Sequence, residues 1–190
     1  MKLLLCFVCL ASVARGQAPV PLPLDPVTHR IHYQAVVPVA GVSQPDLLTR
    51  ACGWATGAAS PTTPPVITHE QDTDVLAMSG TLPFIYTYSL AGTANGLPRT
   101  RTNRLVLHYT VRLHLREGHY LYQVTDFAFA WPAAATPEPA ESEFFEMRAL
   151  NEEAARSLTA ERTRFQQATA TLLTQLQDAM SNPNGQSAVR

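Results

Sequence analysis

The 190-residue sequence is almost free of lysine and poor in cysteine, and each shortage excludes a class of protein. Lys2 is the single lysine, and the formal net charge is −1, which argues against a general binder of nucleic acid or of anionic membranes. Of the three cysteines, only Cys52 lies outside the first ten residues. One thiol forms no internal disulfide and matches none of the cysteine spacings of zinc sites.

The sequence also has no apolar run long enough to span a membrane, although a shorter run stands at its start. Residues 1–16 combine Lys2, an apolar run from Leu3 to Ala14 and the small residue Gly16, which is the pattern of a secretory signal peptide. We therefore expect cleavage near residue 16 and export to the periplasm or beyond. Cleavage lowers the basic count from 14 to 12 against 15 acidic residues, so the mature net charge is about −3.

The short motifs of common catalytic and metal centres are missing as well. No Gly-x-Ser-x-Gly turn is present, and no catalytic motif surrounds Cys52. Asp72 and Asp74 lack the glycine and the terminal glutamate of a calcium loop. His108 and His114 share a strand face but lie roughly 20 Å apart, too far for one metal ion. We expect no cofactor, no metal and no catalytic residue, with a hydrolase-type enzyme as the weakest functional alternative.

What the sequence does contain is one strongly patterned stretch, Arg104 to Trp131. From Leu105 to Leu115 every odd position is apolar, whereas five of the six even positions are polar. This alternation predicts a β-strand with one buried face, because successive side chains of a strand point to opposite sides. Glu117 and Gly118 then predict a two-residue type I′ turn, after which a second strand returns antiparallel to the first.

The register of this hairpin decides which side chains of the second strand are buried. We favour the register in which the facing pairs near the turn are all apolar. Those pairs are Leu115 with Tyr120, Leu113 with Tyr122, and Val111 with Val124. This register also puts Asp126 on the core face opposite Tyr109, where the carboxylate needs a hydrogen bond from Tyr109 or from backbone N–H groups. The alternative is a glycine bulge, which would turn Leu121, Phe127 and Phe129 inward.

In the favoured register, the outward face of the hairpin gathers the candidate binding residues. Basic side chains lie toward the turn and aromatic ones lie at the far end: His108, Arg112, His114, Arg116, Phe127, Phe129 and Trp131. We expect this face to bind an unidentified protein or a small anionic or aromatic ligand. Two alternatives stay open, both consistent with a structural envelope module. In one, the glutamate-rich segment 138–153 covers the face; in the other, the aromatic end forms a homodimer.

The rest of the chain predicts a single α+β domain over residues 29–181. Before it lies a proline-rich, extended lead-in at 17–28, and after it a frayed tail at 182–190. The remaining strand patterns cover 30–39, 66–70 and 75–90, and helical patterns cover 43–57 and 142–181, the latter with a break at Asn151 or Ser157 as one interpretation. The order β-α-β-β-β-β-α predicts an antiparallel sheet of about five strands with two helices on one face.

Several short motifs recur in a characteristic order along the chain. They are PLDPVTHRIHYQAVVPVAGVSQPDLLTRACGWA, LAMSGTLPF, YLYQVTDF and a closing QDAM. Their order, over about residues 22–181, resembles an exported bacterial family of unknown function with a TATA-binding-protein-like (TBP-like) fold. The resemblance implies a curved antiparallel sheet with two helices on its convex face, and it implies no activity. It does not imply DNA binding either, because function belongs to sites and an exported protein would not meet a promoter.

Overall fold

The computed structural model describes residues 21–57, 66–70, 74–90, 99–132, 134–146 and 152–182. In chain order the elements are β1 (Tyr33–Pro38), α1 (Gln44–Gly57), β2 (Val66–Glu70), β3 (Val75–Leu90), β4 (Arg99–Arg116), β5 (His119–Ala130), β6 (Glu138–Pro139), η1 (Ser142–Glu146) and α2 (Glu152–Ser181). This order agrees with the predicted one, and the structure adds the two-residue strand β6 and the short π-helix η1.

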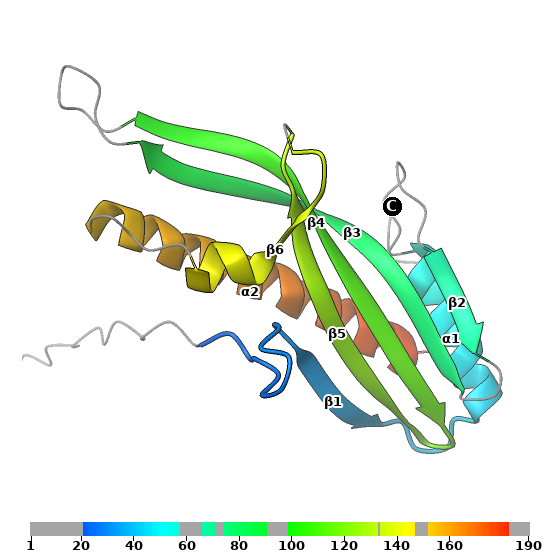
Figure 1. Ribbon diagram of the computed structural model, residues 1–190. Helices are drawn as coiled ribbons and strands as arrows, with labels where there is room; N and C mark the ends of the chain where they lie inside the picture. The colour runs from blue at the N-terminus through cyan, green and yellow to red at the C-terminus, as the bar shows by residue number, and fades with distance from the viewer. Residues whose placement is uncertain are drawn as a thin grey trace, which may run out of the picture.

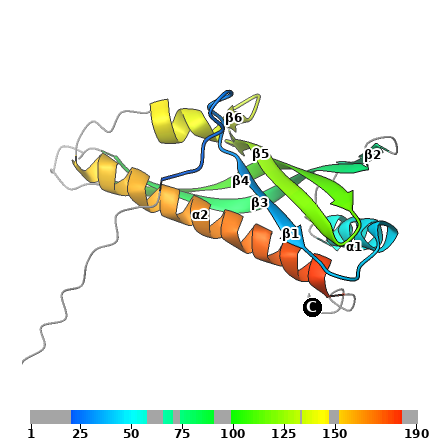
Figure 2. The ribbon, with the colours of Figure 1, turned by 90° about the horizontal axis from the view of Figure 1, so that it is seen from below.

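The strands form one antiparallel sheet in the order β1-β5-β4-β3-β2, and β6 pairs with β5. The sheet bends along its length, and α1 and α2 lie behind it in Figure 1. Figure 2 shows both of these helices beneath the sheet, where α2 contacts α1 and β3. No helix of the described residues covers the opposite face of the β4–β5 hairpin, which we call the open face. The predicted α+β class is therefore confirmed.

The hairpin between β4 and β5 has the predicted register near its turn. Leu115 faces Tyr120, Leu113 faces Tyr122, and Val111 faces Val124. All six of these side chains are buried on the helix side of the sheet. Gly118 takes a positive φ of 73°, as expected. Glu117 does not have a positive φ. A type I′ turn needs positive φ at both positions, so the turn is not of this type.

A β-bulge at Asp126 corrects the prediction for the second half of β5. Thr110 pairs with Thr125 but His108 pairs with Ala128, so two residues of β5 oppose one residue of β4. Asp126 adopts a positive φ of 55°, and its carboxylate leaves the core to pair with Arg30 at 2.9 Å. The expected core position of Asp126 and its expected hydrogen bond from Tyr109 are therefore wrong.

The bulge also places the aromatic residues that follow it on the opposite face of the sheet from the predicted one. Phe127 and Phe129 are each 1% exposed and lie on the helix side, so their predicted outward position is wrong. Burying one phenylalanine stabilises the fold by roughly 1.5–3 kcal/mol, whereas one residue in the left-handed region costs about 1–3 kcal/mol. Two buried phenylalanines outweigh one strained aspartate. The alternative register was right about these two rings but wrong about Leu121, which stays half-exposed on the open face.

β3 follows its predicted alternation, with Leu76, Met78 and Phe84 buried. Gly80 and Pro83 suggest a bulge or an edge in this strand, and the structure shows the edge: β2 pairs with β3 only as far as Ser79, whereas the pairing of β3 with β4 runs through Gly80 without a bulge. Gly80 makes room for the ring of Tyr109 on the facing strand. A Cβ atom at Gly80 would stand 2.5 Å from the ring carbon Cζ, so no larger residue fits without a shift.

α2 supplies hydrogen-bond partners to a part of β3 that has no neighbouring strand. β2 pairs with β3 only from Val75 to Ser79, so within the described residues the edge beyond Ser79 is open. At Thr87 the backbone N–H donates to the carboxylate of Glu161 at 3.0 Å, and the Ser157 hydroxyl donates to the Thr87 carbonyl at 3.0 Å. Two side chains of a helix thus replace the backbone groups of a missing strand.

The described part of the lead-in, from residue 21, is not extended throughout. Residues 26–28 form a turn in which the Asp25 carboxylate accepts backbone hydrogen bonds from Val27 at 3.0 Å and from Thr28 at 2.7 Å. These bonds lower the pKa of Asp25 to about 2. Leu24 and Ile31, which stand on either side of the turn, form an antiparallel β-bridge. The prediction of an extended lead-in, which rested on proline content, did not include this hydrogen-bonded turn.

Candidate functional site

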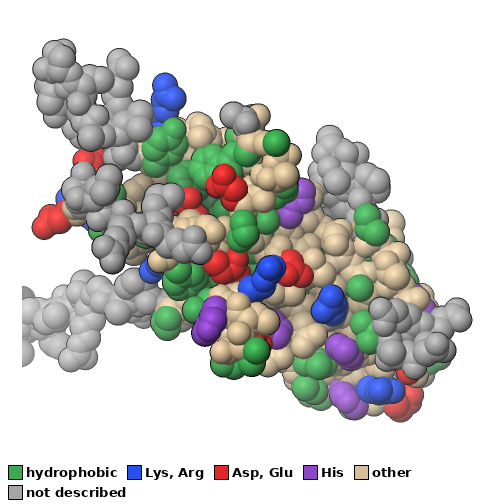
Figure 3. All heavy atoms as spheres, viewed as in Figure 1, with side chains coloured by type: hydrophobic (Ala, Val, Ile, Leu, Met, Phe, Trp, Pro, Cys, Tyr) green, Lys and Arg blue, Asp and Glu red, His purple; other side chains and the backbone are tan. Residues whose placement is uncertain are grey.

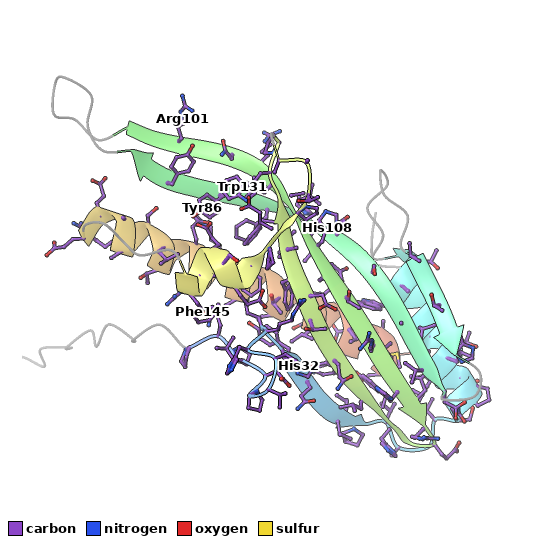
Figure 4. All side chains as sticks on the ribbon, in the orientation of Figure 1. His32, Tyr86, Arg101, His108, Trp131 and Phe145 are labelled. Carbon is purple, nitrogen blue, oxygen red and sulfur yellow. The ribbon has the colours of Figure 1, made fainter. Side chains whose placement is uncertain are left out.

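The structure distributes the seven candidate residues over two faces of the sheet. His108, Arg112, His114 and Arg116 lie on the open face, as their even positions in β4 predicted. Phe127 and Phe129 lie in the core, and the half-buried Trp131 sits with its ring centroid 5.1 Å from that of Tyr86. Figure 4 shows Trp131 beside Tyr86 and His108 further along β4. The prediction that these basic and aromatic side chains lie together on one face is therefore wrong.

The aromatic residues form a packed cluster beneath the sheet. The ring centroid of Phe129 lies 5.0 Å from that of Phe84, 5.8 Å from that of Phe144 and 6.5 Å from that of Phe165. Phe144 belongs to η1, so the described part of segment 138–153 does cover the aromatic end. It does so on the helix side and leaves the basic residues of the open face exposed. The enclosed rings of Phe127 and Phe129 offer no face for stacking a ligand, whereas the half-buried Trp131 stays partly accessible.

The polar side chains that β4 presents on the open face form what we call the β4 strip: Arg104, His108, Thr110, Arg112, His114 and Arg116. From His108 onward successive members stand roughly 7 Å apart, because every second residue of a strand faces the same side, and Arg104 lies about twice that distance from His108. Arg116 is held by Asp74 at 3.3 Å. Arg104 and Arg112 are exposed, and neither has an ion-pair partner among the described residues. Sequence reasoning missed Arg104 as a candidate, although its even position placed it on this face.

Neutral side chains surround Arg112 on the neighbouring strands. Gln123 of β5 and Ala77 of β3 face Arg112 directly, and Gln34 of β1 lies beyond Gln123. Thr110 is likewise flanked by Ser79 and Thr125. Figure 3 looks onto this face and shows basic side chains on a largely neutral surface, densest toward the β4–β5 turn. The local surroundings thus offer hydrogen bonds to a ligand and no carboxylate beside Arg112.

A buried acidic cluster on the helix side escaped the sequence analysis. Tyr86 donates a hydrogen bond from its hydroxyl to Glu143, which is 7% exposed, and Arg164 donates one to Glu161, which is 1% exposed. Burial is the main cause that raises the pKa of both glutamates, and also that of Tyr86. A signal for Glu161 was present, because it stands four residues before Phe165 on the apolar stripe of α2.

Two hollows of the described surface are lined by residues outside the β4 strip, although the smaller one includes Asp74, the partner of Arg116. A groove of about 480 Å³ is lined by Pro21, Pro23, Tyr33, Gln166, Ala170 and Leu173, where the lead-in meets β1 and α2. Burial raises the pKa of Tyr33 in this groove to about 12. A smaller hollow of about 160 Å³ adjoins the start of α1. No three or more His, Cys, Asp or Glu side chains of the described residues are placed to share a metal ion.

An antiparallel sheet with both long helices on one face and an open opposite face defines a TBP-like α+β domain. Solved structures share it: a TBP-like protein from Parabacteroides distasonis has 12% identity and a TM-score of 0.57, over 85% of this chain and 97% of that one. A DUF4468 family protein from Bacteroides ovatus has 14% identity and a TM-score of 0.60, over 85% of this chain and 92% of that one. At these identities the likeness establishes the fold, which confirms the predicted TBP-like architecture.

No family model and no curated protein matches this sequence. The similar structures carry no statement of a ligand or an activity in their descriptions, which is consistent with a protein of unknown function. Within the described residues, no helix is both long and apolar enough to cross a membrane. Any assignment of function therefore depends on the chemistry of the described surfaces.

Proposed function

We propose that this protein is a non-enzymatic binding domain that takes an anionic partner on its open face. The observation that carries the proposal is the unequal pairing of the arginines. Those with described side chains outside β4 each reach an acceptor, as does Arg116: Arg30 with Asp126, Arg50 with Met180, Arg116 with Asp74, Arg156 with Glu152, Arg162 with Phe144 and Arg164 with Glu161. Among the described side chains, the unpaired ones are Arg101, Arg104 and Arg112, all on β4.

Arg112 is the central residue of this proposal, because a second explanation applies to Arg101 and Arg104. β5 ends opposite Val106, so the earlier part of β4 has no β5 neighbour, and arginines there also discourage pairing with another chain. Arg112 lies between paired strands, where no edge needs protection. A guanidinium binds carboxylate, phosphate or sulfate through two parallel hydrogen bonds, and Gln123 supplies a further donor.

The shape of the open face supports an extended partner. Small ligands are normally enclosed in pockets of several hundred Å³ that bury most of their surface. The described hollows lie elsewhere, and the aromatic rings that would stack on a base or a neutral sugar are buried under the sheet. The chain carries more acidic than basic residues, so attraction of an anion depends on the local charge of β4 rather than on net charge.

Substituting Arg112 with glutamine is expected to weaken binding to a polyanion. Hydrogen bonds to charged groups contribute about 1.5–3 kcal/mol, so the affinity of the mature chain for heparin should fall by roughly ten-fold or more. Affinity is measured by calorimetric titration at fixed low salt. Arg156→Gln is the matched control, because it removes the same charge from the exposed surface of α2. Equal losses in the two variants, or no heparin binding by the wild type, would contradict the proposal.

We also infer that the protein is exported. Residues 1–16 support this inference through their single lysine, short apolar run and small residues before the cleavage point. When the full chain is expressed in a bacterium with a general secretory pathway, N-terminal sequencing of the exported fraction is expected to start near Gln17. A chain that stays in the cytoplasm with Met1 intact would refute export and would leave the binding proposal standing.

A further inference from the structure

η1 is attached to the rest of the fold by hydrogen bonds and ring packing, and one of these bonds belongs to the buried acidic cluster. From β3, Tyr86 donates a hydrogen bond to Glu143 of η1, and from α2, Arg162 donates one to the carbonyl of Phe144. The Phe144 ring is fully buried, and its centroid lies 5.2 Å from that of Phe165. Figure 4 shows Tyr86, which bonds to η1, with Trp131 next to it. The described contacts of this five-residue element are thus one buried ring, one carbonyl, one carboxyl group and the exposed Phe145 ring, over which the Arg162 guanidinium lies.

The charges in this cluster do not balance. Glu143 interacts with Tyr86 of β3, Glu138 of β6 and Glu161 of α2, and Tyr88 lies beside Tyr86. Among the described residues, the cations bonded at this cluster are Arg162 and Arg164 of α2. Arg164 is bonded to Glu161, and Arg162 donates to a backbone carbonyl. Glu161 also accepts the Thr87 N–H, while one of its oxygens is buried without a partner.

This asymmetry decides which carboxyl group holds a proton. Glu161 has a bonded cation and a backbone donor, which both favour its charged form. Glu143 has one neutral donor, the Tyr86 hydroxyl, and no bonded cation among the described residues, so fewer contacts favour its charged form. Burial, with Glu138 adding to it, raises the pKa of Glu143 above its ordinary value of 4.5. Because the folded pKa is raised, the docked state is favoured at acid pH and loses stability as pH rises through that pKa.

We propose that Glu143 is a proton-operated latch that docks η1 when protonated and releases it when ionised. An ionised Glu143 would be a buried charge next to Glu161 with no cation bonded to it, and such a charge is expensive unless it reaches water. Release of η1 lets the carboxylate hydrate, uncovers Phe144 and the adjoining face of Phe129, and leaves Tyr86, against which Trp131 packs, without its hydrogen-bond partner. The device is independent of the β4 strip, which lies on the other face of the sheet.

The test follows Trp131, whose ring lies against Tyr86 at the edge of the cluster. Trp54→Phe removes the one other tryptophan, so fluorescence then reports Trp131 alone. In this background, acrylamide quenching is expected to rise between about pH 5 and about pH 9 while the circular dichroism of the helices stays constant. Adding Glu143→Gln is expected to abolish the rise, because the amide still accepts the Tyr86 hydrogen bond and cannot ionise.

Glu138→Gln is the matched control, because it neutralises an exposed carboxylate near the latch. The quenching transition is expected to persist and to move to lower pH, since a negative neighbour of Glu143 has been removed. Should Trp54→Phe not fold, hydrogen exchange of the wild type and of Glu143→Gln at both pH extremes gives the same answer for residues 142–146. A transition that survives Glu143→Gln, or that disappears in Glu138→Gln, overturns the proposal.

Discussion

Replacing Phe129 with alanine is expected to lower the free energy of unfolding by about 3–5 kcal/mol, the range for large aromatic truncations in a core. The magnitude follows from the position of the ring, which is 1% exposed and contacts Phe84, Tyr86, Phe144 and Phe165. Each aromatic pair contributes beyond the area that it buries. Urea denaturation followed by circular dichroism measures the loss, provided that the denaturant slope is unchanged.

Phe145 provides the matched control for Phe129. It is the same residue type, but its side chain is 45% exposed and its described ring contact is with the guanidinium of Arg162, 5.3 Å from the ring centroid. An exposed cation–π contact contributes about 0.5–1 kcal/mol, so Phe145→Ala should cost no more than about 1 kcal/mol. Equal costs for the two variants would mean that β5 continues past Asp126 without the bulge.

Replacing Gly80 with alanine is expected to destabilise the protein by about 1–3 kcal/mol through overpacking. This sign opposes the usual effect of the change, because alanine in place of glycine normally stabilises a strand by restricting the unfolded chain. The difference arises from Tyr109, whose Cζ and hydroxyl oxygen would each stand 2.5 Å from the new Cβ. The Tyr109 ring is enclosed in the core and cannot easily move away.

A double-mutant cycle identifies the ring as the cause. In a Tyr109→Leu background the shorter side chain leaves room for the Cβ, so Gly80→Ala should become neutral or stabilising, with a coupling energy of about 1–3 kcal/mol. Tyr109→Leu also removes a buried hydroxyl that has no partner and whose pKa burial raises to about 12. Additive losses in the double variant would place the destabilisation elsewhere than in this contact.

The sequence predicted the parts of the fold that regular periodicity determines. Alternation in β4 identified its buried face, and apolar matching identified the hairpin register as far as Val124. The helix stripe ending at Met180 identified α2. Each of these features repeats over several turns or residue pairs, so a local pattern is enough to specify it. The β-α-β-β-β-β-α order and the open face followed from the same patterns.

The bulge and its consequences depended on contacts that are distant in sequence. Outside the core, the carboxylate of Asp126 pairs with Arg30, 96 residues earlier, and the buried Phe127 contacts Phe165 of α2. A local signal was nevertheless present, because the apolar positions of β5 change from even at Val124 to odd at Phe127. Such a change of phase indicates one extra residue in a strand. The prediction that Phe129 points outward was wrong because it assumed that the even positions stay buried to the end of β5.

The candidate sites differ in the same way: one could be predicted from a local sequence pattern, and the other depends on contacts between distant segments. The basic residues of β4 were found from their even positions alone, and the structure adds that Arg112 has no partner among the described residues. The latch joins Tyr86, Glu143 and Glu161 from β3, η1 and α2, and no spacing in the sequence links these three residues. A glutamate in an acidic segment is normally solvated, and only the packing of Phe144 takes Glu143 out of water.

The bonds from Ser157 and Glu161 to Thr87 give α2 a second role, as a shield against aggregation. An uncovered strand edge readily pairs with the same edge of another molecule, which is the first step toward insoluble fibres. Because α2 follows every described strand in the chain, the strands leave the ribosome or an export channel before the helix does. Newly made chains therefore pass through an interval in which the edge of β3 can pair with another chain, and slow delivery of Glu152–Ser181 would lengthen it.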